Sequence, residues 1–224
     1  MQPYLFPYVG YFQVLNAVDQ YIVYDNVQYI KGGWINRNNI LIGGNKTLFT
    51  ISLRDASPNK LINQIDIQDD FKKFLKTIGM AYSRAPHKEP VMELLTRICA
   101  YEDKNLARFA KNSLQQVADY LGITTQILFA SDLEKERQLT AQDEVIALCK
   151  MVDADRYINA IGGEELYDKE AFAKQGIELC FLQTQPISYK QLGGEFVSNL
   201  SIIDLLMFNS VEEMQTILNK YILV

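Results

Sequence analysis

Residues 9–26, VGYFQVLNAVDQYIVYDN, contain a helical pattern that is followed at once by a strand pattern. Apolar residues recur at helical spacing from Val9 to Val18, whereas Tyr21–Tyr24 is the β-branched and aromatic run expected of a buried strand. We expect this strand to end at Asp25. A helix that leads directly into a buried strand is typical of α/β folds.

The same alternation returns in the second half of the chain. Strand patterns cover 125–129, 156–159 and 177–182, and helical patterns cover 140–152 and 168–175 between them. Strands that alternate with helices in this way indicate βαβ units. We therefore expect an α/β fold with a mostly parallel, Rossmann-like sheet flanked by helices.

Other segments are added to this alternation. Residues 34–53 predict a β-hairpin centred on Gly43-Gly44-Asn45, and residues 61–67 add a short strand. Residues 69–121 form a helical block, a possible insertion or lid, and 202–207 and 211–221 are also helical. The helices of the block are expected at 69–82, 88–100 and 105–121. No linker composition divides the chain, so we expect a single domain over 1–224.

Composition excludes several classes of protein. The 224 residues are 48% hydrophobic and 22% charged, which is typical of a soluble globular protein. The net charge of −5 comes from 22 basic and 27 acidic residues and argues against nucleic acid as a partner.

The opening of the chain is free of charge until Asp19, yet residues 1–18 include two prolines and three tyrosines, which argues against a membrane span. It also lacks the basic start and small-residue cleavage site of a signal peptide. We expect a cytoplasmic protein without membrane insertion.

Cysteine and histidine usage limits the metal chemistry. The three cysteines, Cys99, Cys149 and Cys180, are widely spaced in apolar surroundings, so neither a disulfide framework nor a zinc site is expected. His87 is the single histidine, which excludes a multi-histidine metal site. We expect no metal ligands and interpret Cys149 as a core thiol.

Two stretches near the start combine groups that bind small polar ligands. Residues 2–12, QPYLFPYVGYF, place a proline-stiffened loop ahead of a helix N-terminus; this indicates either an anion site that Gly10 leaves open or an apolar plug. Residues 25–39 collect charged side chains, carboxamides and aromatic rings after the first strand, which suits sugars, phosphates and carboxylates, or simply a polar hairpin. The candidate residues of these stretches are Gln2, Tyr4, Gly10, Asp25, Gln28, Tyr29, Lys31, Trp34, Asn36, Arg37 and Asn38.

Three further positions carry weaker signals. His87 lies in a proline-bracketed loop beside Arg84 and is the one side chain that titrates near neutrality. Gly162-Gly163, followed by Tyr167, ends a predicted strand, where a ligand could approach the backbone or the glycines could form an ordinary turn. Asp204 follows Ser201 at a spacing that resembles a capping box.

Taken together, these segments resemble the WbqC-like family. The resemblance rests on residues 2–12, on VDQYIVYDNVQYIKGGWINRN (18–38), on YSRAPH (82–87), on YINAIGGEELYD (157–168) and on LSIIDLLMFN (200–209). Members commonly have a first strand before the Gln-Pro pair, and here Gln2 directly follows Met1, so we expect that strand to be absent or shortened. The family is associated with bacterial O-antigen and surface-polysaccharide gene clusters.

The resemblance implies an acyl- or aminoacyltransferase, with glycine as one suggested group, that acts on an amino sugar or nucleotide sugar. It favours His87 as a functional residue, together with Gln2, Asp25, Gln28, Trp34, Asn36, Arg37, Asn38 and Asp204. Our hypothesis makes His87 the general base with Asp25 orienting or assisting it, and places Lys31 and Arg37 on a phosphate or carboxylate. Trp34 and Tyr29 would stack on the sugar or base, and Asn36 and Asn38 would bind hydroxyls. The expected partners are small molecules: a nucleotide sugar or an activated acyl donor. A cofactor is not indicated. Two alternatives stay open, a nucleotidyl or adenylyl transferase that takes Mg²⁺ with its nucleotide and a non-catalytic carbohydrate-binding protein of the same pathway.

Overall fold

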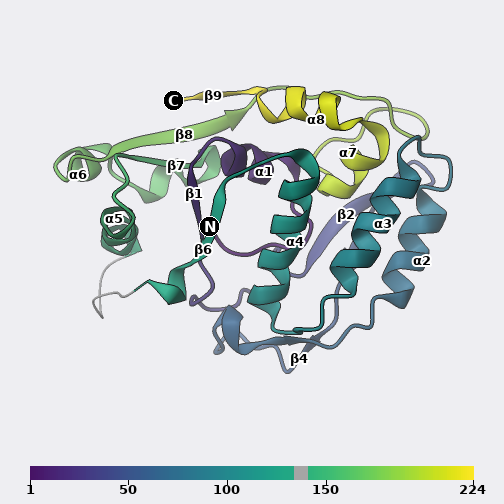
Figure 1. The fold of residues 1–224 in the computed structure, drawn as a ribbon, viewed down its shortest axis with the longest axis horizontal. Coiled ribbons are helices and arrows are strands. Elements are labelled where there is room, and N and C mark those ends of the chain that lie inside the picture. The colour runs from purple at the N-terminus through teal and green to yellow at the C-terminus, as the bar shows by residue number, and fades with distance from the viewer. Residues whose placement is uncertain (134–140) are drawn as a thin grey trace.

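The chain has a mixed α/β fold, and its structure, a computed structural model, describes residues 1–133 and 141–224 (Figure 1). Thr140, the expected first residue of the helix over 140–152, lies outside the described residues. The described strands form four small sheets, three of two strands and one of three.

The parallel pairs lie in two different sheets. Strand β1 (Gln20–Val23) pairs in parallel with β6 (Gln126–Phe129). Strand β7 (Arg156–Ala160) pairs in parallel with β8 (Glu178–Thr184), to which β9 (Tyr221–Leu223) adds an antiparallel edge. The expected α/β class is therefore confirmed. The expected single Rossmann-like sheet is not found, because within 1–133 and 141–224 no strand pairing joins β1 to β7.

Helix α1 (Val9–Asn16) connects these two sheets. It packs against β7 and β8 and against the C-terminal helix α8, and Figure 1 shows it close under β8. Seven of its eight residues, Val9 to Leu15, are buried. The opening of the chain is thus a core helix and not a surface or membrane segment.

The expected hairpin is present with shifted ends. Strands β2 (Arg37–Ile42) and β3 (Asn45–Thr50) pair in antiparallel around Gly43-Gly44, both of which have positive φ. This is the backbone that a two-residue hairpin turn needs. A second antiparallel pair joins β4 (Leu53–Arg54) to β5 (Asp66–Ile67), with the short 3₁₀ helix η1 (Ile62–Gln64) between them in the sequence. Because η1 takes up residues 62–64, only the end of the strand expected over 61–67 forms.

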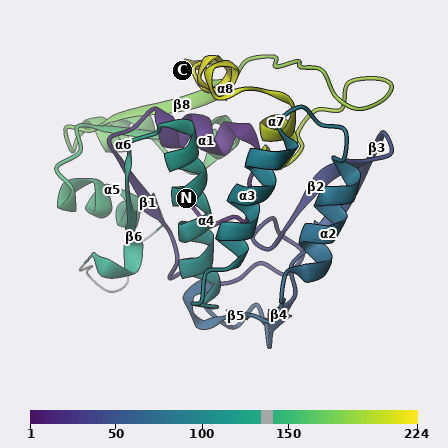
Figure 2. The ribbon, with the colours of Figure 1, turned by 45° about the vertical axis from the view of Figure 1, so that its right-hand side comes forward.

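The helical block forms a packed layer. Helices α2 (Lys72–Ala81), α3 (Lys88–Cys99) and α4 (Leu106–Leu121) stand side by side in Figure 2, in front of the hairpin. Gly122 ends α4 in the left-handed conformation, as its position predicted. Residues of this layer such as Phe109 and Leu114 are fully buried in the same core as the first helix and strand, so the block packs as part of the main core.

The last third of the chain returns to short elements. Two 3₁₀ helices, η2 (Ala130–Asp132) and η3 (Ile161–Leu166), follow β6 and β7, and the α-helices are α5 (Ala141–Met151), α6 (Lys169–Ala173), α7 (Ile202–Phe208) and α8 (Val211–Leu218). The helix expected over 211–221 ends earlier than predicted, at Leu218. Tyr221 leaves the helix because it pairs with Thr184 of β8. Among the described residues, no helix is both long and apolar enough to cross a membrane.

The buried apolar side chains form two clusters. The larger unites α1, β1, the hairpin, the helical layer and α7. The smaller lies around α5, α6 and β8 and includes Ile146, Cys149 and Phe172.

Candidate functional site

A cavity of about 660 Å³ lies between β1 and β7, in the size range of ligand sites in proteins. Its wall includes Gln20, Tyr21 and Ile22 of β1, Tyr24 just beyond that strand, and β7 from Arg156 to Ala160. The first residues of the chain and side chains of α1 and α5 complete it. The two strands run in the same direction across it. Gln20, at the start of β1, donates through Nε2 to the carbonyl of Val152 just before β7 (3.4 Å), whereas Tyr24 and Tyr167 line the opposite end.

We call this opposite end the polar mouth and define it by Gln2, Tyr4, Asn159, Gly163 and Tyr167. It lies at the carboxyl ends of β1 and β7, where α/β proteins generally bind their ligands. The Gln2 carbonyl accepts a hydrogen bond from the Tyr11 hydroxyl (2.7 Å), which fixes the loop that carries it. Burial raises the pKa of Tyr4, so its phenol stays protonated and can donate a hydrogen bond at neutral pH.

The two neighbouring glycines, Gly162 and Gly163, differ in the space around them. A Cβ on Gly163 would come within 2.7 Å of Asn159 Nδ2, whereas a Cβ on Gly162 would meet no atom within 4 Å. Gly163 therefore makes room for Asn159, whose Oδ1 accepts from the Ala160 backbone N–H (2.8 Å). The ring of Tyr167 packs edge-on against Tyr157, 5.7 Å between centroids, so that part of the mouth is an aromatic wall.

Asp25 follows β1 and holds three segments together. Its carboxylate accepts from the Ser131 backbone N–H (3.0 Å), from the Ser131 hydroxyl (2.7 Å) and from Asn63 Nδ2 (3.0 Å). Only 3% of Asp25 is exposed. The sequence placed this residue correctly at the strand end, but its two oxygens are occupied by the protein itself.

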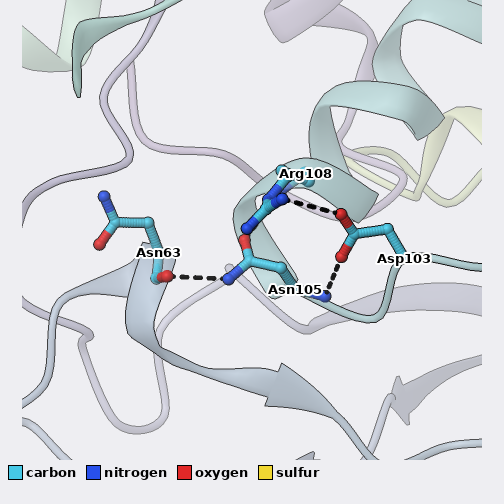
Figure 3. Close-up of polar contacts among 4 residues, drawn as sticks. All are labelled: Asn63, Asp103, Asn105 and Arg108. Carbon is cyan, nitrogen blue, oxygen red and sulfur yellow. Dashed lines mark hydrogen bonds and ion pairs between the residues drawn. The ribbon is translucent and has the colours of Figure 1, made fainter. Parts of the chain in front are cut away.

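Asn63 extends this contact to the helical layer (Figure 3). Its side-chain amide points away from Asn105, while its backbone carbonyl accepts from Asn105 Nδ2 (2.8 Å). Arg108 and Asp103 pair across the same helix start at 3.1 Å. The carboxyl end of β1 is thus anchored to the beginning of α4.

His87 lies at the other end of this layer. Its backbone N–H donates to the Met207 carbonyl (3.2 Å). Its side chain lies near Glu212, whose pKa is lowered mainly by hydrogen bonds from its own backbone and from Ser210. The twelve residues of α3 separate it from the turn that leads to Asn105, a length of about 18 Å. The expected assistance of His87 by Asp25 therefore has no direct contact to support it.

The polar hairpin stretch divides into exposed and buried residues. Gln28, Lys31 and Trp34 are exposed, and Arg37 lies half-buried with its guanidinium 5.7 Å from the Trp34 ring while Nε donates to the Gly33 carbonyl (2.9 Å). None of these side chains lines the cavity.

The carboxamides of this stretch serve the backbone. Asn36 accepts from the Tyr29 hydroxyl (3.0 Å) and donates to the Ile51 carbonyl (2.7 Å). Asn38 donates to the Phe6 carbonyl (2.8 Å), where Phe6 has a positive φ of 48°. These residues hold the loops of the fold, and hydroxyl binding by Asn36 and Asn38 would require their present partners to leave.

Asp204 is not a capping residue but the centre of a buried cluster. Its carboxylate accepts from the Tyr82 hydroxyl (2.8 Å), from the Tyr189 hydroxyl (2.5 Å) and from Gln191 Nε2 (3.0 Å). Burial raises the pKa of Asp204, and the hydrogen bonds from Tyr189, Tyr82 and Gln191 oppose that rise. Ser201 caps α7 as expected, by accepting from the Ile203 N–H (3.3 Å).

Gly10 does not leave an anion site open, which is the role that the sequence suggested for it. It lies buried inside α1, and a Cβ there would approach the ring of Tyr8 to 2.4 Å. It accommodates Tyr8 and does not line the cavity. Residues from Leu5 onward are the apolar plug that the sequence offered as one alternative, whereas Gln2 and Tyr4 reach the cavity.

The structure therefore gathers five sequence candidates, Gln2, Tyr4, Gly162, Gly163 and Tyr167, at one cavity and places Asp25 immediately beyond Tyr24 at its rim. Sequence reasoning missed Asn159 and Tyr157 of the lining, although both fall in the YINAIGGEELYD segment that was singled out. Cys149 also lines the cavity, but burial raises its pKa to about 11, so the thiol is not a nucleophile at neutral pH.

Comparison with known proteins finds a relative and a family model that each cover most of the chain. The chain is 29% identical over 205 residues to the uncharacterized protein Rv1507c of Mycobacterium tuberculosis (strain ATCC 25618 / H37Rv), which covers 89% of this chain and 88% of the relative. No solved structure matches the chain. The model of the WbqC-like protein family matches residues 2–216, from the Gln2 of the cavity to the last helix, and the chain belongs to that family.

Proposed function

We propose that the protein is a transferase of surface-polysaccharide biosynthesis that moves an acyl or aminoacyl group onto an amino sugar, and that the polar mouth binds the sugar or nucleotide sugar. The observation that carries the proposal is the convergence of Gln2 and Tyr4, from the first motif, with Gly163 and Tyr167, from the fourth, at one cavity. The reaction class itself comes from the family resemblance.

The chemistry of the mouth suits a neutral hydroxyl-rich ligand. Its polar groups are carboxamides and phenols, which form directional hydrogen bonds with sugar hydroxyls, and its tyrosine rings offer flat faces for a sugar or base. Of the cationic side chains in the described parts of the chain, only Arg156 lines the cavity, at the far end from the mouth. Phosphates of a nucleotide sugar would therefore extend outward from the mouth.

The transfer needs a group that accepts a proton as the amine nitrogen attacks the donor carbonyl and the leaving group departs. The family resemblance favours His87 for this role, but His87 does not line the cavity, so a ligand in the polar mouth lies out of its reach. We propose instead that the departing group of the donor takes this proton and that Asp25 holds the rim. His87→Ala should then leave both turnover and binding at the mouth unchanged. A fall in turnover of about 10²–10⁴-fold, the effect of losing a general base, would place the chemistry at His87 and contradict the assignment of the mouth.

The binding part of the proposal is tested by a pair of alanine variants. Nucleotide-linked amino sugars are first screened by thermal shift, and the one with the largest shift is titrated by calorimetry. Gly163→Ala must displace Asn159 and should weaken binding about tenfold, the effect of losing one or two hydrogen bonds. Gly162→Ala, which adds the same methyl group in open space, should bind like the parent protein. Equal affinities in both variants would contradict the assignment of the mouth.

A second function, carbohydrate binding without catalysis, is favoured by the absence of histidine and lysine among the described residues of the mouth. Ligand binding that depends on Gly163, with no product formed and no loss on changing His87, would support it. Stabilisation by ATP or CTP that requires Mg²⁺ would instead support nucleotidyl transfer.

A further inference from the structure

The β2–β3 hairpin has one side in the core and one side that points away from it. Opposite residues of an antiparallel pair point to the same side, and Asn38 with Phe49 points inward, where the Phe49 ring packs against Phe74 of α2 (5.2 Å between centroids). The alternating positions, among them Arg37 and Leu48, therefore point outward. Figure 2 shows the hairpin at one edge of the molecule, beside the helical layer that covers its inner side.

Three large apolar side chains are exposed on or next to this outer side. Leu48 on β3 is 48% exposed, and Ile30 and Trp34, in the loop before β2, are 52% and 47% exposed. Arg37 connects the loop to the hairpin, because its guanidinium lies 5.7 Å from the centre of the Trp34 ring and its Nε donates to the Gly33 carbonyl (2.9 Å). These residues therefore belong to one surface.

The charged side chains of this region are all cationic. Residues 26–54 contain four Lys and Arg residues and no carboxylate side chain, although the whole chain has a net charge of −5. Lys31 and Lys46 are exposed, Arg37 is half-buried, and none of these three forms an ion pair within 1–133 and 141–224. A positive surface without ion-pair partners attracts anions. We define the outer hairpin surface by Ile30, Lys31, Trp34, Arg37, Lys46 and Leu48.

We propose that the outer hairpin surface binds an anionic lipid surface, with its three apolar side chains in the headgroup region and its three cations on lipid phosphates. Tryptophan is favoured at this depth because its ring is apolar and its N–H is polar. Each Lys or Arg near an anionic membrane adds to binding. Apolar insertion and a cationic patch together are the two signals that stable peripheral binding needs.

The arrangement favours a lipid surface over a folded protein partner. The Arg37 guanidinium contacts the Trp34 ring, and Arg37 pairs with Thr50 across the ladder. Leu48 follows two residues from Thr50 along β3, and Lys46 lies two residues further. Apolar and cationic side chains thus alternate over about 14 Å or more, the length of strand from Thr50 to Lys46. The core of a protein interface is poor in charged residues and in lysine above all, whereas a headgroup layer accepts both kinds of side chain.

This inference goes beyond the proposed function, because the outer hairpin surface is separate from the polar mouth. None of its residues lines the cavity between β1 and β7. Ligand binding at the mouth is measured without vesicles and vesicle binding without ligand, so failure of either proposal is distinguishable from failure of the other.

The test uses Trp34, which is the single tryptophan of the chain and therefore reports on this surface alone. The full chain is titrated with phosphatidylcholine vesicles that contain about one third phosphatidylglycerol. Its emission should shift to shorter wavelength, and lipids brominated in their acyl chains should quench it, because the ring enters the interface. Vesicles of phosphatidylcholine alone should cause little shift, and raising the salt concentration from about 0.1 to 0.5 M should release the protein.

A pair of double variants tests the cations. Lys31→Gln with Lys46→Gln should weaken partition into the anionic vesicles about tenfold or more, because two contacts with lipid phosphates are lost. Lys174→Gln with Lys220→Gln removes the same charge from exposed positions outside the hairpin and should bind like the parent protein.

A second pair tests the apolar side chains. Leu48→Glu should weaken partition about tenfold or more, whereas Met151→Glu, at a position of α5 with similar exposure (42%), should change it little. Unchanged Trp34 emission with the anionic vesicles would overturn the proposal, as would vesicle binding that is equal in each variant and its control. A shift with polyglutamate and none with vesicles would assign the surface to an acidic protein and would also contradict it.

Discussion

At the scale of single residues, the buried carboxylate of Asp204 gives the protein a pH dependence. Its folded pKa is raised above the ordinary value of 3.8, so folding takes up a proton in the range just above that value. The free energy of unfolding should therefore fall as the pH rises through this range. Asp204→Asn, which cannot titrate, should show a flatter profile in urea unfolding between pH 4 and 6. Parallel profiles for the two proteins would contradict the assignment.

A second residue-scale prediction concerns Asn38, which the sequence indicated as a ligand-binding residue. Its amide bonds the Phe6 carbonyl and its oxygen accepts from the Asn39 N–H, both at 2.8 Å. Asn38→Ala should lower the free energy of unfolding by about 2 kcal/mol, because two backbone groups lose their partners in a buried place. The exposed Lys31→Ala serves as control and should leave stability within about 0.5 kcal/mol. A stable Asn38→Ala protein that fails to bind ligand would reverse this interpretation.

At the scale of elements, two helical glycines should respond oppositely to alanine. In α1, Gly10→Ala places a Cβ 2.4 Å from the Tyr8 ring and should destabilise the protein by about 1–3 kcal/mol. In α2, Gly79→Ala meets only Met92 Cε at 3.7 Å and should stabilise by about 0.5–1 kcal/mol. Urea unfolding measures the change in the free energy of unfolding for both variants. A change of the same sign in both would show that the contact with Tyr8 is not the reason for a glycine at position 10.

Most elements could be predicted from local pattern, and the misses have local causes. The hairpin follows from Gly43-Gly44 and the end of α4 from Gly122, because each position needs a backbone that glycine adopts readily. Tyr221 was assigned to a helix because its apolar neighbours continue the spacing of α8, and only the edge of β8 draws it into a strand. Such pairing between distant segments leaves no signal in a local window.

The candidate site was harder to predict for the same reason. Asn36, Asn38 and Asp25 are candidates because their side chains are polar. In the structure, however, each of these side chains is hydrogen-bonded to groups that are distant in sequence. The residues that do converge, Gln2 and Gly163, lie far apart in sequence and meet only through the packing of α1 between the two sheets. The sequence thus predicts which segments contribute to the site, whereas which of their residues reach the cavity depends on the tertiary structure.

At the scale of the whole molecule, the cavity divides a sheet that the sequence expected to be continuous. Strand β1 and its partner β6 lie on one side and β7, β8 and β9 on the other, with the polar mouth at the carboxyl ends of β1 and β7. The central claim is that ligand binds at the mouth and not at the exposed hairpin or at His87.

Hydrogen exchange with and without the nucleotide sugar that gives the largest thermal shift tests this claim most directly. Ligand should slow exchange in residues 2–4 and 159–167 together, two segments that share only the cavity. Residues 31–37 and the start of α3 should exchange at unchanged rates. Protection confined to residues 31–37 or to the neighbourhood of His87, with none at 159–167, would contradict the account.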